Sequence, residues 1–306
     1  MDAHLGTAPL QPAFDVIVAP RTRVGESPVW DLAAQQLWWV DIEGRFIHGH
    51  DVATGATESW PTDERPACIA PHCDGGLIAG MDSAVFHLRP WADGRLDATS
   101  VAVAAHRRDG MRFNDGRCDR QGRFWLSSMV RDMALGAAAG ALYRVDADGL
   151  SAPLVGGLVT GNGLAFSPSG DRLYLSDSHP DVQRIWVFDL APDGTLSNRR
   201  DFVDMKRHPG RPDGAAVDAD GCYWTCANDA GLLLRFTPAG RLDRSLALPV
   251  SKPSMCTFGG PGLDTLYVTS IVPAQPAPGF DAGLDGALLA LRPGVQGLAD
   301  PPFAFP

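Results

Sequence analysis

Ser167-Pro-Ser-Gly170 leads into Arg172-Leu-Tyr-Leu-Ser-Asp177, and Arg184-Ile-Trp-Val-Phe-Asp189 runs into the turn Pro192-Asp-Gly194. Both apolar runs are short and rich in aromatic and branched residues. Each is bounded by Gly, Pro, Asp or Ser, which are the residues of tight turns. The stretch therefore predicts two short strands between tight turns.

The same arrangement recurs along the chain at a regular distance. Six copies place the apolar strand 39, 47, 49, 50 and 43 residues apart, and a propeller blade of four short strands takes about 40–50 residues. A β-sandwich would not repeat at this period, and WD40 and kelch signatures are missing. The strands are marked by Trp38, Leu77, Phe124, Leu173, Tyr223 and Leu266.

The six copies account for nearly the whole chain. We therefore predict an all-β fold, a six-bladed β-propeller, in which residues 1–306 form a single domain and residues 1–15 and 293–306 are peripheral tails. The segments 131–140 and 272–286 are longer than the other connections, and long loops of this kind often carry function. We expect them to shape the mouth of the central channel.

The composition agrees with this fold and excludes several classes of protein. Of 306 residues, 34 are Gly and 25 are Pro, too many for a helical bundle, and the hydrophobic content of 45% argues against disorder. The net charge of -10 leads us to expect no nucleic-acid partner. Only two of the basic residues are lysines, Lys206 and Lys252, and without a Gly-Lys pair a phosphate-binding P-loop is excluded.

The sequence also gives expectations for location. The N-terminal residues have no basic region followed by an apolar core, so we expect no signal peptide. Residues 151–170 are uncharged but contain five Gly, so we expect no membrane span and no membrane partner. The six cysteines are scattered and are expected to be reduced. These features favour a soluble, cytoplasmic protein.

Four polar segments fit the repeat poorly. Each places Glu, Asn or Asp beside Gly or Pro immediately before an apolar strand, at the start of a blade unit. The innermost strands of a propeller begin around one channel, so these side chains are expected to converge there. Alternatively, Asp-Gly and Asn-Gly pairs are ordinary turns. The segments are Gly25-Glu-Ser-Pro-Val-Trp30, Arg112-Phe-Asn-Asp-Gly116, Thr160-Gly-Asn-Gly-Leu-Ala165 and Pro212-Asp-Gly-Ala-Ala-Val217.

Taken together, these segments carry a family resemblance. With Gly122-Arg-Phe-Trp125, Tyr174-Leu-Ser-Asp-Ser178 and Phe258-Gly-Gly-Pro261, the chain resembles the senescence marker protein/gluconolactonase/regucalcin-like family over residues 20–292. The resemblance implies a six-bladed propeller that hydrolyses sugar lactones. Matched motif to motif, it implies metal ligands at Glu26, Asn162 and Asp213, and substrate-binding residues at Arg112 and Asn114.

Further substrate contacts are implied less directly. An acidic contact of the family falls near Asp132, although the surrounding loop departs from the usual sequence. The pairs Asp63-Glu64 and His208-Pro209 lie in loops where members of the family differ, so we expect substrate choice to reside there. His179 is a further candidate for the channel mouth.

The implied residues permit a specific chemistry. An all-oxygen set of two carboxylates and one amide suits one hard or borderline divalent ion: Ca²⁺, Zn²⁺, Mn²⁺, Mg²⁺ or Fe²⁺. Such an ion polarises a lactone carbonyl, and Asp213 would act as general base on the attacking water. Arg112 and Asn114 would donate to the sugar. We expect a hydrolase acting on a carboxylic ester, with a small sugar lactone as substrate and an aldonic acid as product, and a monomeric or homodimeric chain.

Two other functions stay open at this point. A non-enzymatic calcium-binding or regulatory propeller would bind metal without turnover, and a related hydrolase would act on aryl esters or phosphotriesters in an apolar pocket. A nucleophilic serine is disfavoured, because Ser27 precedes a strand and lacks the second glycine of a nucleophile elbow. His48 and His50 have no evident third zinc ligand.

Overall fold

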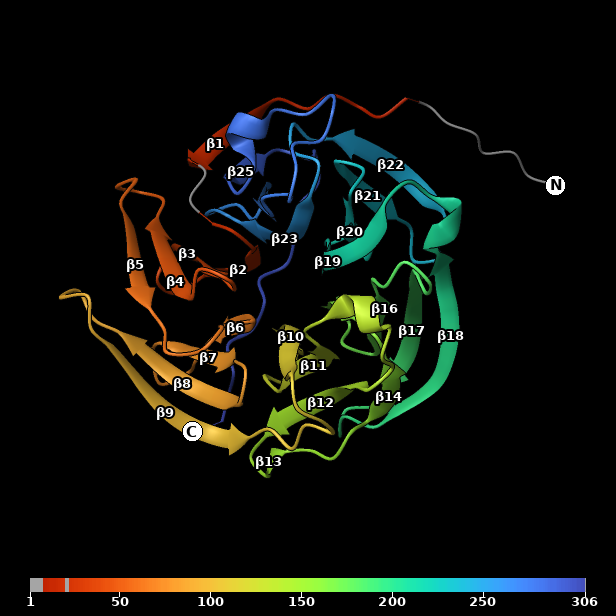
Figure 1. The fold of residues 1–306 in the computed structure, drawn as a ribbon. Helices are drawn as coiled ribbons and strands as arrows, with labels where there is room; N and C mark the ends of the chain where they lie inside the picture. The colour runs from red at the N-terminus through yellow and green to blue at the C-terminus, as the bar shows by residue number, and fades with distance from the viewer. Residues whose placement is uncertain (1–7, 20–21, 306) are drawn as a thin grey trace.

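Six small β-sheets stand around one central axis (Figure 1) in the computed structural model, which describes residues 8–19 and 22–305. Neighbouring strands in each sheet are antiparallel, and the strand order runs outward from the axis. The predicted six-bladed, all-β propeller is confirmed. Blades one to three consist of β2 (Gly25–Asp31), β3 (Gln36–Asp41), β4 (Phe46–Asp51), β5 (Thr57–Pro61); β6 (Cys68–Pro71), β7 (Leu77–Gly80), β8 (Ala84–Pro90), β9 (Leu96–Val103); and β10 (Met111–Cys118), β11 (Phe124–Val130), β12 (Gly140–Asp146), β13 (Gly149–Leu150), β14 (Val155–Leu158).

The remaining blades follow the same plan, and three short 3-10 helices lie in the connections. The apolar runs that predicted the fold are the second strands of the blades, one position out from the axis. Blades four to six consist of β15 (Gly161–Phe166), β16 (Arg172–Asp177), β17 (Arg184–Leu190), β18 (Leu196–Asp204); β19 (Arg211–Val217), β20 (Tyr223–Asn228), β21 (Leu232–Phe236), β22 (Leu242–Ala247); and β23 (Pro253–Gly259), β24 (Thr265–Ser270), β25 (Leu288–Leu291), with the helices η1 (Met133–Leu135), η2 (Met205–Arg207) and η3 (Ala282–Leu284).

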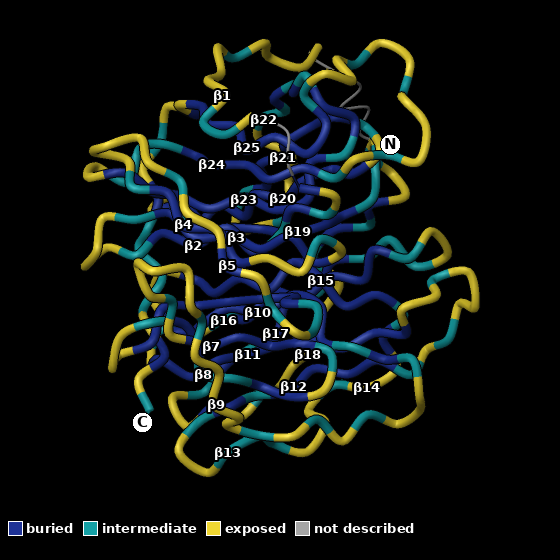
Figure 2. The backbone as a smooth tube through the Cα atoms, turned by 60° about the vertical axis from the view of Figure 1, so that its left-hand side comes forward, coloured by how far each residue is buried: buried dark blue, intermediate teal, exposed yellow. Residues whose placement is uncertain are grey.

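A buried aspartate holds the turn between the first and second strands in blades three and five. The carboxylate of Asp119 accepts hydrogen bonds from the backbone nitrogen of Arg123 and the indole nitrogen of Trp125, and Asp218 accepts from the indole of Trp224 in the same way. Both indoles are fully buried in hydrophobic clusters that join adjacent blades, as their apolar surroundings predicted. Figure 2 shows burial concentrated in the inner strands and exposure along the outer strands and loops.

The first described residues close the ring. Strand β1 (Phe14–Val18) pairs with β25, with Phe14 opposite Leu291, and so supplies the outermost strand of blade six. Leu10 forms a bridge to Leu246 in blade five. Residues 8–15 are therefore tied to the sheets and do not form the peripheral tail that the sequence suggested; residues 1–7 of that predicted tail lie outside the described residues.

The C-terminal segment also differs from the expectation. Residues 293–306 were predicted to be peripheral, but residues 293–305 cross the central axis toward blade two (Figure 1), and residue 306 lies outside the described residues. Gly297 forms a bridge to Asp218, Asp300 pairs with the buried Arg117, and Phe303 is only 1% exposed. Burial of the Phe303 ring and the pairing of Asp300 with Arg117 account for this path. Neither contact belongs to the repeat, so the repeat pattern could not predict it.

The cysteines and the helices of the described chain bear on two further expectations. All six cysteines are free thiols, as predicted. Among residues 8–19 and 22–305, the only helices are short, and none has the length and apolar character needed to span a bilayer.

Candidate functional site

A cavity of about 400 Å³ lies at the end of the axis where the innermost strands begin. Its wall includes five of the six residues that the sequence predicted for the site. These five side chains come from the first strands of four blades. Side chains nearer the channel interior are the more buried ones: Asn162 is 5% and Asp213 is 7% exposed. The predicted residues that line it are Glu26 on β2, Arg112 and Asn114 on β10, Asn162 on β15 and Asp213 on β19.

The four polar segments lie within the innermost strands, whereas the sequence placed them just before the strands. Each contains a β-bulge, a shift in pairing with the second strand that leaves two residues out of register. A bulge bends a strand locally and redirects a side chain. The Gly and Pro residues that looked like turn formers therefore mark bulges. The shifts fall between Glu26 and Val29, Phe113 and Gly116, Asn162 and Ala165, and Pro212 and Ala215.

Gly163 shows why one of these bulges needs a residue without a side chain. Its φ is +64°, and a Cβ atom there would lie 2.4 Å from the hydroxyl of Tyr223 and 2.6 Å from that of Ser176. The Tyr223 hydroxyl also donates a hydrogen bond to the Gly163 carbonyl at 2.8 Å. The tyrosine thus occupies the space that a side chain would need, and the bulge beside Asn162 depends on glycine.

We expect Gly163→Ala to lower the free energy of unfolding by about 2–5 kcal/mol, because it adds a steric clash to an unfavourable backbone conformation. Urea denaturation measures this. Gly55→Ala is the matched control: φ is +73° and a Cβ would meet nothing within 4 Å, so only the backbone cost of about 1–2 kcal/mol applies. Equal losses in the two variants would show that the contact with Tyr223 has no effect.

Four side chains form a hydrogen-bonded network in the cavity wall. The amide nitrogen of Asn162 donates to Asp213 Oδ1 and to the Ser178 hydroxyl, both at 2.8 Å, and the amide nitrogen of Asn228 donates to Asp213 Oδ2 at 2.6 Å. Both amide hydrogens of Asn162 are therefore used. Within the described chain its carbonyl oxygen has no donor, so this oxygen is the atom available to a ligand.

Both acidic side chains of the predicted metal site have raised pKa values. Burial raises the pKa of Asp213 to about 7, although Arg211 and the hydrogen bond from Asn228 act in the opposite direction. Burial, followed by the charges of Asp213 and Asp115, raises the pKa of Glu26 well above its usual range. Two carboxyl groups that resist ionisation, next to a free amide oxygen, form a donor set that a divalent cation would complete. The residues present therefore fit a divalent ion.

Arg112 and Asn114 act as a pair. Arg112 Nη1 donates to Asn114 Oδ1 at 2.6 Å and to the Phe113 carbonyl at 2.8 Å, while the Asn114 amide nitrogen donates to the Gly161 carbonyl at 2.8 Å. The Asn114 amide is thus engaged at both ends and holds the guanidinium in place. Nε and Nη2 of Arg112 have no acceptor in the described chain and are available to a ligand.

Asp132 is not brought into the cavity wall. Its carboxylate accepts a hydrogen bond from the backbone nitrogen of Ala134 at 3.1 Å and so caps helix η1, and the residue is exposed. The next residue, Met133, lines the cavity instead. The prediction that Asp132 contacts substrate therefore has no support from its position, because a capping role keeps its side chain at the loop surface.

The two candidate histidines also lie away from the cavity wall. The Nε2 atom of His179 is 3.3 Å from the Met133 carbonyl oxygen, so the ring packs behind the loop that carries Met133. The His208 ring packs edge-on against Phe236, with centroids 5.1 Å apart. Neither ring is among the groups that line the cavity.

Several wall residues were missed by the sequence analysis. Asn228 and Ser178 orient Asp213 and Asn162, and each ends or follows the second strand of a blade, a position that the repeat could have marked. Arg211 stands two residues before Asp213, and Lys252 is one of two lysines. The apolar part of the wall was not predicted either. The missed residues, polar and apolar together, include Val24, Ile42, Met129, Thr160, Ser178, Arg211, Asn228, Lys252 and Ile271.

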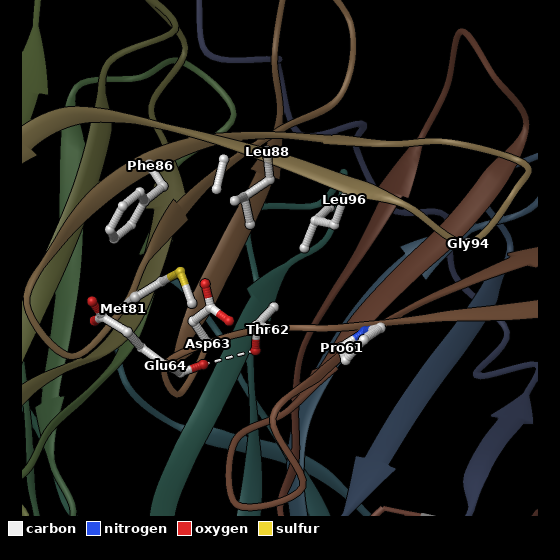
Figure 3. A pocket seen from close by; sticks show the side chains of 10 residues that line it. Pro61, Thr62, Asp63, Glu64, Met81, Phe86, Leu88, Gly94 and Leu96 are labelled. Atoms are coloured by element: carbon white, nitrogen blue, oxygen red, sulfur yellow. Dashed lines mark hydrogen bonds between the residues drawn. The ribbon is translucent and has the colours of Figure 1, made fainter.

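A second cavity, of about 430 Å³, opens on the side of the molecule between blades one and two (Figure 3). Asp63 and Glu64 line it, together with apolar side chains such as Phe86 and Leu96. The Glu64 carboxylate is occupied by the backbone and hydroxyl of Ser83. The pair that we expected to influence substrate choice therefore lines the side cavity and not the axial one.

Known proteins that resemble this chain include named lactonases. A 6-deoxy-6-sulfogluconolactonase from Pseudomonas putida is 36% identical over 293 residues, covering 94% of this chain and 97% of the relative. Pentonolactonase XacC from Haloferax volcanii is 32% identical over 258 residues, covering 83% and 84% of the two chains. Such relatives support the expectation of a hydrolase that acts on a carboxylic ester.

The fold has solved counterparts as well. The structure of regucalcin from Agrobacterium tumefaciens, described as a calcium-binding protein, superimposes with a TM-score of 0.87 at 25% identity and covers 97% of this chain and 99% of its own. Residues 24–272 match the family described as the SMP-30/gluconolactonase/LRE-like region. The match spans all four polar segments and most of the six blades, so the chain belongs to the SMP-30/gluconolactonase/LRE-like family.

Proposed function

We propose that the protein hydrolyses a sugar lactone to the corresponding aldonic acid in a reaction that depends on one divalent cation. The observation that carries the proposal is the convergence of Glu26, Asn162 and Asp213 with the guanidinium of Arg112 in a single cavity. The named lactonases among the relatives support the same reaction. Glu26, Asn162 and Asp213 would hold the ion through their oxygens, which leaves calcium, zinc, manganese, magnesium and iron(II) as candidates.

Different residues of the chain would carry out different steps of the reaction. When bound, the cation supplies a Lewis acid for the ester carbonyl. Asp213 takes a proton from water as the water oxygen attacks the carbonyl carbon. The free nitrogens of Arg112 donate to the oxygen that gains negative charge. The bond between the carbonyl carbon and the ring oxygen then breaks, the ring oxygen takes the proton from Asp213, and the aldonic acid leaves as its carboxylate.

The amides in the wall are positioning groups in this scheme. Asn228 and Asn162 each donate one hydrogen bond to a different oxygen of Asp213, which fixes the plane of the carboxylate. Asn114 fixes Arg112 by the contact already described. Prearranged donors and acceptors of this kind need little reorganisation during the reaction.

Metal removal tests the proposal. We expect protein stripped with a chelator to lose at least about 100-fold of its turnover on a panel of pentono- and hexono-lactones, and to regain it when one of the five ions is added. Acid release in a pH-stat gives the rate, and a blank without protein corrects for spontaneous hydrolysis. Metal binding without turnover of any lactone would favour a regulatory propeller. Turnover that survives complete removal of the metal would contradict the cation requirement.

A further inference from the structure

Three innermost strands have a basic residue at equivalent positions, within the strand in β10 and β19 and immediately before it in β23. In β10, β19 and β23 the last paired residue before the bulge is Phe113, Pro212 or Pro253, and the residue before it is Arg112, Arg211 or Lys252. All three basic side chains line the axial cavity. In β2 and β15 the same position holds a glycine, Gly25 or Gly161.

Two of these cations, Arg211 and Lys252, stand nearer the cavity mouth than Asp213. Arg211 precedes Asp213 by two residues along β19, a distance of about 7 Å in an extended strand. The side chains of Arg211 and Lys252 are 21% and 26% exposed, whereas Asp213 is 7% exposed. The cavity therefore has a floor of carboxylate and amide groups and a basic side at its mouth.

One carboxylate serves two of these cations. Asp229 accepts from Arg211 Nε at 2.6 Å through one oxygen and from Lys252 Nζ through the other. The side-chain oxygen Oδ1 of Asn228 lies 3.4 Å from Arg211 Nη2 and 3.4 Å from Lys252 Nζ. The remaining nitrogen of Arg211, Nη1, donates a hydrogen bond to the backbone carbonyl of Ser178. Lys252 has three N–H donors and two partners in the described chain, so one donor is free to face the cavity.

The charge balance of the cavity is positive once a cation is present. Three cations and two carboxylates line it, and a divalent ion would cancel the two carboxylates. Asp229 then offsets only one of the three basic side chains. This excess stands out in a protein whose net charge is -10 and which has only two lysines. Arg112 serves the oxygen that gains negative charge, so the remaining excess is the one positive charge that Arg211 and Lys252 keep after sharing Asp229. A neutral sugar lactone has no charged group that would pair with this excess, whereas an acidic one does.

We propose that the preferred substrate is an anionic sugar lactone, one that carries a carboxylate, sulfonate or phosphate at the end remote from its ester carbonyl. The carbonyl faces Asp213, and the acidic group lies at the mouth beside Lys252, with Arg211 behind it. This inference rests on the proposed lactone hydrolysis and assigns Lys252 as the residue that determines substrate charge.

The test compares substrates of one size and different charge. Wild-type protein, loaded with its activating ion, receives a neutral hexono-lactone and the same lactone with a 6-carboxylate, a 6-sulfonate or a 6-phosphate. We expect kcat/KM for at least one acidic lactone to exceed that for the neutral one by about tenfold or more at low salt, and this preference to shrink as salt is added. The three acidic arms identify which group fits.

Variants then locate the effect. Lys252→Gln should lower the acidic-to-neutral ratio of kcat/KM about tenfold, mainly through KM. Lys206→Gln is the matched control, since the other lysine donates to the Asp181 carbonyl and does not line the cavity; it should leave the ratio unchanged. Equal kcat/KM values in the wild type, or an equal fall for both substrates in Lys252→Gln, would overturn the inference while leaving lactone hydrolysis intact. Absence of turnover on every lactone would refute the proposed function, and the inference with it.

Discussion

Asp213→Asn is expected to lower kcat on the preferred lactone by about 10³-fold or more, since one substitution removes both a general base and a charged metal ligand. Asparagine has nearly the same shape, so the cavity keeps its form. It offers only one acceptor oxygen, however, whereas the carboxylate accepts from both Asn162 and Asn228. Steady-state acid release with saturating metal measures the loss.

A stability measurement separates this loss from misfolding. The folded protein holds the pKa of Asp213 at about 7, above the ordinary value of 3.8, so it binds this proton more tightly than the unfolded chain does. Without metal, the contribution of Asp213 to stability therefore falls as pH rises from about 4 to 7, and above that range the carboxylate is destabilising. Metal-free Asp213→Asn at pH 8 should therefore unfold at or above the wild-type temperature, since the substitution removes a destabilising charge. Asp148→Asn, in an exposed turn, is the control for activity; activity of Asp213→Asn within tenfold of wild type would exclude Asp213 as base.

The second large effect concerns the opposite end of the axis. Arg117 is 7% exposed in its side chain, pairs with Asp300 of the C-terminal segment, and donates to the carbonyls of Leu164 and Ala215 in blades four and five. Arg117→Met should lower the free energy of unfolding by about 3–5 kcal/mol, because Asp300 would be left without its cationic partner and two carbonyls without their donor. Urea denaturation gives the value.

An exposed ion pair provides the control for that result. The side chains of Arg292 and Asp264 are 71% and 48% exposed, and Arg292→Met should cost less than about 1 kcal/mol. Adding Asp300→Asn to Arg117→Met should recover part of the lost stability, since the unpaired charge disappears. A loss as small as that of Arg292→Met would mean that the C-terminal segment does not secure the blades through Arg117.

The repeat made the fold predictable, and the exceptions have physical causes. Turn residues and apolar runs are local properties, so six copies of one unit could be recognised without any contact being known. The partners of Phe14 and Phe303 are Leu291 and the region around His72, each far away in the sequence. The local composition of the two ends does not predict such pairing. The sequence therefore indicates tails at both ends.

Part of the axial cavity wall was predictable too. The segments that hold Glu26, Asn162 and Asp213 stood out because carboxylates and amides interrupted a pattern of apolar strands, and the family resemblance then implied these three residues as metal ligands. Asp132 lies outside the cavity wall, since its side chain caps helix η1, which the sequence did not predict. Lys252 was noticed only as a rare residue; its role at the mouth depends on the bulge registers of β19 and β23, which become visible when the strands are paired.

The pairing of β1 with β25 has a consequence for how the protein is made. The strand of blade six that is synthesised first must wait for a partner near the other end of the chain, with Phe14 opposite Leu291. Contacts of such long sequence separation slow folding. The nascent blades can form one after another, but the ring cannot shut until residues 288–291 have been synthesised. A chain that stops early leaves an open sheet edge at the seam, and such edges promote aggregation.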